Sequence, residues 1–281
     1  MENSTALFCT TVSTPDTQLR RAAEAAASKS MHLAVLLHSE FPTLPMNAYG
    51  SMPYGSFAIP DDWPETLKAA QTEYRERTNA IEAILAEANV SADIRPLFVA
   101  HPDLQKGVVH ASRTSDIACI ASDLRDNTAL FKEVLNAVLF HSPVPALING
   151  LPGTDPGTVL VAWDNSLACA RAVHQALPYL KRADDVQIAC YDVPTLVGGH
   201  ALEPGREVSA WLSHHGCNVT LKQLPSGGRE IGTCILNHAV EIGADLIVAG
   251  AYGHSRLQQA VFGGTSRTLI EQSDVAVLMA H

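Results

Sequence analysis

The chain repeats one order of sequence patterns in its two halves. In the first half, Asp116 precedes a short apolar run, which is followed by a helical stretch and a second apolar run that ends at Ile148. In the second half, Asp245 precedes a matching apolar run, followed by a helical stretch and a last apolar run that reaches Met279. An internal repeat of this length indicates that both halves adopt the same fold.

Strand-like and helix-like segments alternate through both halves. Short apolar runs bounded by glycine or proline are typical of strands buried in a parallel sheet, and the amphipathic stretches between them are typical of helices. The alternation predicts α/β domains, each with a mainly parallel sheet of five strands flanked by helices and joined by right-handed crossovers. The expected strands are residues 7–12, 33–38, 92–99, 117–121, 144–148, 158–163, 186–191, 219–224, 246–249 and 275–280. The expected helices are residues 15–28, 65–88, 102–112, 128–139, 167–180, 203–214, 230–242 and 264–272.

Residues 151–157 separate the two halves. Their sequence, Leu-Pro-Gly-Thr-Asp-Pro-Gly, has two prolines and two glycines and is typical of a linker. Because 281 residues are enough for two domains, we expect one domain over residues 1–150 and another over residues 158–281. The proline-rich segment 41–64 is expected to be a long loop, and whether it is a lid, a contact arm or a loop packed on its own domain is left open.

The composition argues against several classes of protein. The net charge is −10, with 19 basic and 29 acidic side chains spread along the chain, whereas a general nucleic-acid-binding surface needs a concentrated basic patch. No apolar stretch is long enough to span a bilayer, and the N-terminus lacks the pattern of a signal peptide, so we expect a cytoplasmic protein without a membrane partner. The six cysteines are scattered without a Cys-x-x-Cys pair, which fits buried thiols in a reducing compartment.

A glycine-rich stretch follows the apolar run of the second half. Gly250 ends that run, Gly253 follows, and after nine residues Gly263 and Gly264 lead into an expected helix. Glycine after a strand lets the backbone approach a ligand because it has no Cβ. The unpaired amides and the dipole at a helix N-terminus favour negative charge. Together these features predict a phosphate-binding loop that does not need a lysine.

The spacing of these glycines resembles the nucleotide-binding signature of the universal stress protein family. The resemblance implies two flavodoxin-like (adenine nucleotide alpha hydrolase-like) domains in tandem. It also implies that ATP or another adenine nucleotide, with or without Mg²⁺, binds to the C-terminal domain only. In the family, an aspartate at the position of Asp164 lies at the adenosine end, the residue at the position of Tyr191 contacts the base through its backbone, and the glycine motif holds the phosphates. The implied nucleotide-binding residues are Ala162, Trp163, Asp164, Tyr191, Gly250, Gly253, His254, Gly263, Gly264, Thr265 and Ser266.

Three positions depart from the family pattern. Gly264 stands where the family has a serine, so that Thr265 or Ser266 would have to supply a hydroxyl. Trp163 is larger than the usual residue beside the aspartate, and Tyr191 replaces an aliphatic residue. The alternative is that Asp164 or Ser166 simply caps the following helix.

The first half lacks the binding pattern. When the halves are aligned on their aspartates, Ala121 and Leu124 stand at the positions of Gly250 and Gly253, and about Ser13 stands at the position of Asp164. We therefore expect the first domain to be a degenerate copy that binds no nucleotide.

No motif indicates a metal site or a catalytic nucleophile. Adjacent side chains on a helix point about 100° apart, so His214 and His215 are unsuited to one ion. A helix end capped by Gly216 explains them better. A Walker A lysine and a Gly-x-Ser-x-Gly motif are both absent from the sequence. The chain is therefore expected to turn over nothing, or to hydrolyse ATP slowly.

Three functions remain open at this stage. The first is a cytoplasmic stress-response protein in which nucleotide binding is a signal. The second is a nucleotide-independent interaction protein that keeps the motif as a relic, and the third is a weak ATPase. In the family, two domains associate through their last strands, so residues 144–148 and 275–279 are expected to pair within one chain as an internal pseudo-dimer. A homodimer of the whole chain is left open.

Overall fold

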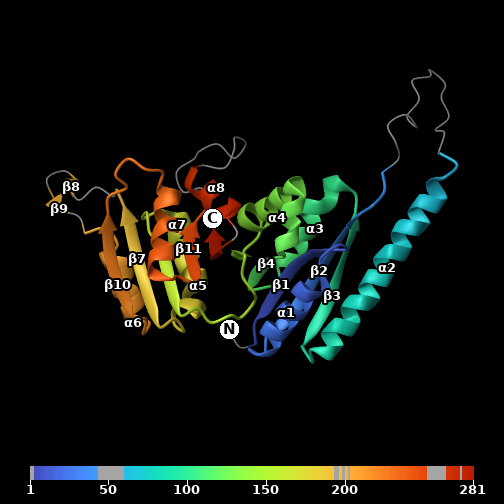
Figure 1. The fold of residues 1–281 in the computed structure, drawn as a ribbon, viewed down its shortest axis with the longest axis horizontal. Helices are drawn as coiled ribbons and strands as arrows, with labels where there is room; N and C mark the ends of the chain where they lie inside the picture. The colour runs from blue at the N-terminus through green and yellow to red at the C-terminus, as the bar shows by residue number, and fades with distance from the viewer. Residues whose placement is uncertain are drawn as a thin grey trace, which may run out of the picture.

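The computed structural model describes residues 3–43, 60–192, 196–197, 200–201, 203–251, 264–272 and 274–281. Within this part of the chain, ten strands form one sheet in the order β10-β7-β6-β11-β12-β5-β4-β1-β2-β3 (Figure 1). These strands are β1 (Thr5–Thr11), β2 (His32–Glu40), β3 (Ala92–Val99), β4 (Ile117–Ile120), β5 (Ala146–Ile148), β6 (Thr158–Ala162), β7 (Asp185–Tyr191), β10 (Val219–Leu224), β11 (Leu246–Gly250) and β12 (Ala276–Ala280). The short strands β8 (Leu196–Val197) and β9 (His200–Ala201) form a separate antiparallel pair.

Helices flank the sheet along its whole length (Figure 1). The α-helices are α1 (Asp16–Ala27), α2 (Trp63–Glu87), α3 (Leu104–Ser112), α4 (Thr128–His141), α5 (Leu167–Leu180), α6 (Arg206–His214), α7 (Ile231–Ile242) and α8 (Gly264–Glu271). Two short 3-10 helices, η2 (His101–Asp103) and η3 (Ser122–Asp126), precede α3 and α4. In each half, consecutive helices pack in pairs: α1 contacts α2, α3 contacts α4, and α7 contacts α8. Because helices cover the sheet, a strand such as β4 is buried along its full length and has an uninterrupted apolar sequence.

The two halves have the same topology. The strand order is β3-β2-β1-β4-β5 in the first half and β10-β7-β6-β11-β12 in the second, with all neighbours within a half parallel. The direction of winding changes between β1 and β4, and again between β6 and β11. Ligands of open α/β sheets bind beyond the carboxyl ends of the strands at such a switch point. The expected fold of two five-stranded α/β units is therefore confirmed.

The last strands of the two halves join the sheet into one. β5 and β12 are antiparallel, with Ile148 opposite Val277 and Ala146 opposite Met279. Each of these strands would otherwise present an unpaired edge to solvent. The linker is also held on both sides, because Asp155 forms ion pairs with Lys29 of the first half and Arg182 of the second.

The expected boundaries differ from the structure at a few helix and strand ends. The helix expected from residue 203 begins at Arg206, because Gly205 adopts a left-handed conformation with φ of 84° at the N-cap. The helix expected from residue 102 begins as η2, and the strand expected from residue 144 begins at Ala146. Gly216 has φ of 86°, which confirms the predicted left-handed glycine after α6. Most of the 41–64 loop lies outside the described residues.

None of the helices in the described part of the chain combines the length and the hydropathy that a membrane span requires.

Candidate functional site

The switch point of the C-terminal half brings four of the predicted binding segments to one edge of the sheet. Asp164 follows the end of β6, Tyr191 ends β7, Gly250 ends β11, and Gly264 begins α8. Because these parallel strands end at the same edge, residues far apart in sequence become neighbours there. The remaining motif residues Gly253, His254 and Gly263 lie outside the described residues.

The capping role after β6 belongs to Ser166. Its Oγ accepts a hydrogen bond from the Cys169 amide at 3.1 Å and so forms the N-cap of α5. Asp164 precedes the helix and accepts a hydrogen bond from the Ser166 amide through Oδ1 at 2.9 Å. Asn165 between them has φ of 61°, a conformation that asparagine tolerates better than most residues. The exposed carboxylate of Asp164 therefore stands at the strand end on a tight turn, and α5 has a separate cap.

Ala162 and Trp163 mainly make contacts that stabilise the fold. The carbonyl oxygen of Ala162 accepts a hydrogen bond from the Cys169 thiol at 3.1 Å. The amide of Trp163 continues the ladder between β6 and β7 by donating to the Ala189 carbonyl at 2.9 Å. The indole is half-buried against the hydrophobic core. These contacts explain how a large residue fits beside Asp164.

The Tyr191 side chain points towards α7. Its hydroxyl lies 3.0 Å from Nδ1 of His238, and the two rings meet edge to face. Burial, together with nearby Cys234 and Glu241, raises the pKa of Tyr191 to about 12, so the phenol is protonated at neutral pH. A tyrosine at this strand end is therefore accommodated by contacts with a helix.

Gly250 is required by packing between the strand and α5. A Cβ built at Gly250 would lie 2.5 Å from the Cys169 amide nitrogen and 2.9 Å from the Ala168 carbonyl carbon. Both atoms belong to the backbone of the first turn of α5, which is buried. The helix backbone occupies the space that a side chain would take, so packing alone explains a glycine here, and contact between Gly250 and a ligand stays a prediction.

The first turn of α8 contains two hydroxyl side chains with different environments. Ser266 is only 6% exposed, and its side chain turns into the protein. Thr265 is half-buried and Gly264 is exposed. Of the two residues expected to replace the hydroxyl missing at position 264, Thr265 is thus the more accessible to a ligand.

Glu230 places a carboxylate beside this turn, which the sequence interpretation missed. It caps α7 by accepting hydrogen bonds from the amides of Gly232 at 3.1 Å and Thr233 at 2.9 Å, and it also accepts one from Thr268 Oγ1 of α8 at 3.2 Å. A Cβ at Gly264 would lie 3.4 Å from Glu230 Oε1. Burial by itself would raise the pKa of Glu230, but hydrogen bonds from Thr233, Gly232 and Thr268 hold it below its ordinary value, so the group is ionised. An acidic residue directly before a glycine-containing helix start is the signal that could have revealed this cap.

The equivalent crevice of the N-terminal half is filled by the chain itself. Leu124, in η3, is 2% exposed, and Ala121 precedes it at the end of β4. Thr14 Oγ1 donates to Asp123 Oδ2 at 2.9 Å and joins the ends of β1 and β4. Ser13, at the position of Asp164, lies 2.8 Å from the hydroxyl of Thr11. This arrangement agrees with the expectation that the first half binds no nucleotide, which stays a prediction.

No metal-binding cluster is found in the part of the chain that the structure describes. Of the two histidines near the end of α6, His215 packs on an aromatic ring, with its centroid 4.5 Å from that of Trp211. The Trp211 ring also lies 4.4 Å from the ring of His174 on α5, between centroids.

Comparison with known proteins supports the fold and the family. The universal stress protein family model matches residues 226–281. A putative universal stress protein from Pseudomonas aeruginosa UCBPP-PA14 is similar to this chain with a TM-score of 0.53 and 15% identity over 99% of this chain and 93% of that one. A protein of unknown function from Pseudomonas aeruginosa PAO1 is similar with a TM-score of 0.51 and 14% identity over 99% and 92% of the two chains. No curated protein sequence matches.

At these identities the two structures support the fold alone, and they do so over nearly the whole chain. The family model covers the segment from the end of β10 through α8 to β12. Residues 226–281 therefore match the universal stress protein family, and the whole chain shares the fold of the two structures.

Proposed function

We propose that the C-terminal half binds ATP or another adenine nucleotide in the cytoplasm as a stress-response signal. The observation that carries this proposal is the pairing of an exposed carboxylate with a helix start at one switch point. Asp164 stands at the end of β6, and α8 begins with Gly264 after β11, the neighbouring strand. Binding would bias the conformation or the partners of the chain.

The chemistry of these two groups suits the two ends of a nucleotide. A carboxylate accepts hydrogen bonds from hydroxyl groups, such as those of ribose. A helix N-terminus presents unpaired amides and a positive dipole end to phosphate oxygens. The family resemblance assigns the same roles to the same positions, with Asp164 at the adenosine end.

Glu230 opposes phosphate binding and is expected to limit affinity. Its ionised carboxylate lies beside Gly264, where phosphate charge is expected. Like charges close together repel, and more strongly when solvent is partly excluded. Glu230→Gln removes this charge and keeps a side-chain carbonyl that caps α7, so the substitution should tighten nucleotide binding.

Isothermal titration calorimetry of ATP with Mg²⁺ tests the proposal. The wild-type chain should bind one nucleotide, and Asp164→Asn should weaken binding by about tenfold or more, because a hydrogen bond to a charged group contributes roughly 1.5–3 kcal/mol. Asp103→Asn is the matched control, since this carboxylate pairs with Lys106 on the surface of the other half. Glu230→Gln should bind more tightly than wild type.

Other outcomes would contradict parts of this account. Two nucleotides per chain would contradict the degenerate first half. Equal affinity of Asp164→Asn and Asp103→Asn would remove Asp164 from the site. No binding by wild type or by Glu230→Gln would refute nucleotide binding and favour the interaction function.

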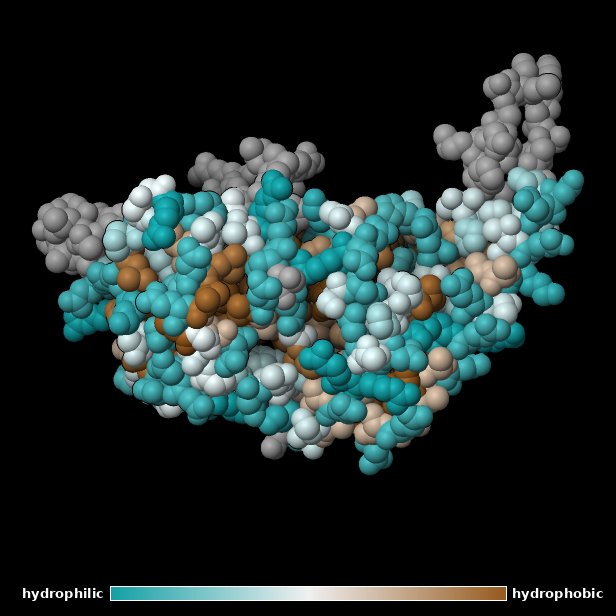
Figure 2. All heavy atoms as spheres, in the orientation of Figure 1, coloured by the Kyte–Doolittle hydropathy of each residue, from teal (hydrophilic) through white to brown (hydrophobic). Residues whose placement is uncertain are grey.

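An exposed apolar surface favours that second candidate, an interaction protein. Val240 on α7 is 73% exposed, and Leu236 one turn earlier is partly exposed. Figure 2 shows hydrophobic side chains gathered over α7. Such surfaces often mark protein contacts, and a second copy of the chain is the simplest occupant to test. Light scattering after size exclusion should show a dimer that Val240→Glu dissociates, whereas a wild-type monomer would refute self-association.

A further inference from the structure

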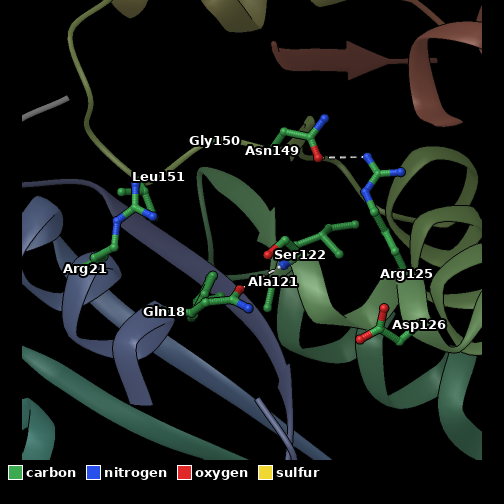
Figure 3. Close-up of a pocket in the computed structure, with 11 residues that line it drawn as sticks. Gln18, Arg21, Ala121, Ser122, Arg125, Asp126, Asn149, Gly150 and Leu151 are labelled. Atoms are coloured by element: carbon green, nitrogen blue, oxygen red, sulfur yellow. Dashed lines mark hydrogen bonds between the residues drawn. The ribbon is translucent and has the colours of Figure 1, made fainter. Parts of the chain in front are cut away.

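A cavity in the N-terminal half has no role in the proposed nucleotide site. It lies between α1 and the carboxyl ends of β4 and β5, and its volume is about 370 Å³ (Figure 3). Pockets for small ligands typically begin at roughly 300 Å³. The filled crevice between Thr14 and Asp123 does not contribute to its lining.

Two arginines stand on opposite sides of this cavity. Figure 3 shows Arg21 on the α1 side and Arg125 on the η3 side, with Gln18 and Ser122 between them. Arg21 is exposed, and its guanidinium has no partner among the residues that the structure describes. One carboxylate, that of Asp126, also lines the cavity. The lining is thus a local excess of positive charge in a chain whose net charge is −10.

Arg125 is held in place and keeps one unused donor. Its Nη1 donates to the Ile270 carbonyl at the end of α8 at 2.5 Å, and its Nη2 donates to Asn149 Oδ1 at 2.8 Å. The guanidinium also lies 4.8 Å over the Phe131 ring. Its Nε is buried and has no hydrogen-bond partner in the described part of the chain. A buried donor without a partner is costly, and a ligand oxygen would relieve that cost.

Neutral donors on the floor of the cavity add to the two arginines. Gln18 Oε1 accepts a hydrogen bond from the Ser122 amide at 3.0 Å, which leaves the Gln18 side-chain NH₂ and the Ser122 hydroxyl to face a ligand. Phe8, Ile120 and Leu151 supply an apolar part of the wall. Charged donors opposite each other with an apolar wall suit a ligand that has an anionic group and a short carbon skeleton.

We propose that this cavity binds a small organic oxyanion, a carboxylate or a phosphate ester, between Arg21 and Arg125. The anionic oxygens accept hydrogen bonds from the arginines and from Gln18, and the carbon skeleton packs against Phe8 and Leu151. Because Arg125 also binds the C-terminal end of α8, the site adjoins the helix that follows the proposed phosphate loop in the other half. The first half would then have exchanged nucleotide binding for the binding of a small anion.

Binding of simple probes to the full chain tests this proposal. Succinate and glycerol phosphate represent the carboxylate and phosphate classes, and both are titrated by calorimetry at constant ionic strength. Arg21→Gln removes an exposed cation that makes no described contact, so the variant should fold. Arg20→Gln is the matched control, because the neighbouring Arg20 on the same helix pairs with Glu87 instead of lining the cavity.

At least one probe should bind to wild type and to Arg20→Gln with equal affinity, and Arg21→Gln should bind about tenfold more weakly. Preference for one probe identifies the ligand class. Binding of neither probe at millimolar concentration would overturn the proposal. Equal weakening by both arginine variants would also overturn it, since that result indicates general charge attraction. ATP is then added as a competitor to wild type and to Arg21→Gln. If ATP displaces the probe from both proteins alike, the probe binds in the nucleotide site, and the proposal that it binds in the cavity is refuted.

Discussion

Replacement of Gly250 by alanine adds a single methyl group, and we expect this change to destabilise the C-terminal half strongly. The new Cβ would lie 2.5 Å from the Cys169 amide nitrogen, whereas ordinary contacts begin at 3.4 Å, so the atoms must separate by about 0.9 Å. Both elements resist this shift. β11 is paired on one side with β6 and on the other with β12, and the first turn of α5 is tied to β6 by the Cys169 thiol.

The size of the effect follows from the cost of overpacking. Extra methyl groups in a well-packed interior typically cost about 1–3 kcal/mol. For a chain of this size, each kcal/mol lowers the melting temperature by roughly 2–4 °C, so Gly250→Ala should melt about 2–12 °C below wild type. Urea denaturation should show the same loss of unfolding free energy, and circular dichroism should show that the fold is kept.

Gly264→Ala is the matched control for this measurement. Its Cβ would lie 3.4 Å from Glu230 Oε1, an ordinary contact, and alanine is favoured over glycine in a helix. The control should therefore be as stable as wild type or slightly more stable. If Gly250→Ala and Gly264→Ala had equal melting temperatures, the assignment of Gly250 to packing against α5 would be refuted.

Three further predictions concern the junction, Glu230 and the thiols. Asn149→Ala should lower the unfolding free energy by about 1–3 kcal/mol in urea denaturation, because it removes hydrogen bonds to the Gln272 and Val275 carbonyls. Asn149 also has φ of 58°, which alanine tolerates less well. An unchanged urea midpoint would contradict a role for these hydrogen bonds in holding the two halves together. The pKa of Glu230 is lowered in the folded chain from its ordinary value of 4.5, so the ionised carboxylate stabilises the fold. This contribution to the free energy of unfolding is complete above pH 4.5 and is lost as the pH falls through the lower pKa of the folded chain. Glu230→Gln should therefore be less stable than wild type at neutral pH and equally stable in strong acid, and a difference that persists in acid would show that charge is not involved. The thiols should not react with a disulfide reagent near neutral pH until the chain is denatured, because all six are buried. Burial raises the pKa of Cys169 to about 12, and burial together with the nearby Asp164 raises that of Cys190 to about 11. Rapid labelling of the folded chain would contradict their burial.

Much of the fold could be predicted because local patterns and tertiary structure agree. The strand expected at residues 219–224 and the helix expected at residues 167–180 have those bounds in the structure. Strand patterns in this chain are short and apolar because both faces of the sheet are covered. Some differences lie at element ends, as at Gly205, where a left-handed glycine delays the start of α6 by a few residues, and the short elements β8, β9 and η3 were not predicted. A pattern of hydrophobicity does not report such a backbone angle.

The candidate site could be predicted by position and only partly by role. Asp164, Gly250 and Gly264 do reach one edge of the sheet, as the parallel topology requires. The sequence did not reveal that Gly250 is also required by packing, because the atoms that exclude a side chain there belong to α5, about eighty residues earlier. Glu230 was missed for the same reason, since its approach to α8 depends on how two helices pack.

The sequence by itself determined the repeat, the alternation of strands and helices, and the loss of the glycine motif from the first half, because each of these is written in local patterns. Tertiary structure decided what those patterns touch. It joined β5 to β12 in a single sheet, set Glu230 beside Gly264, and brought Arg21 and Arg125 to opposite sides of one cavity. Contacts between residues distant in sequence depend on the packing of whole elements, which no local spacing encodes.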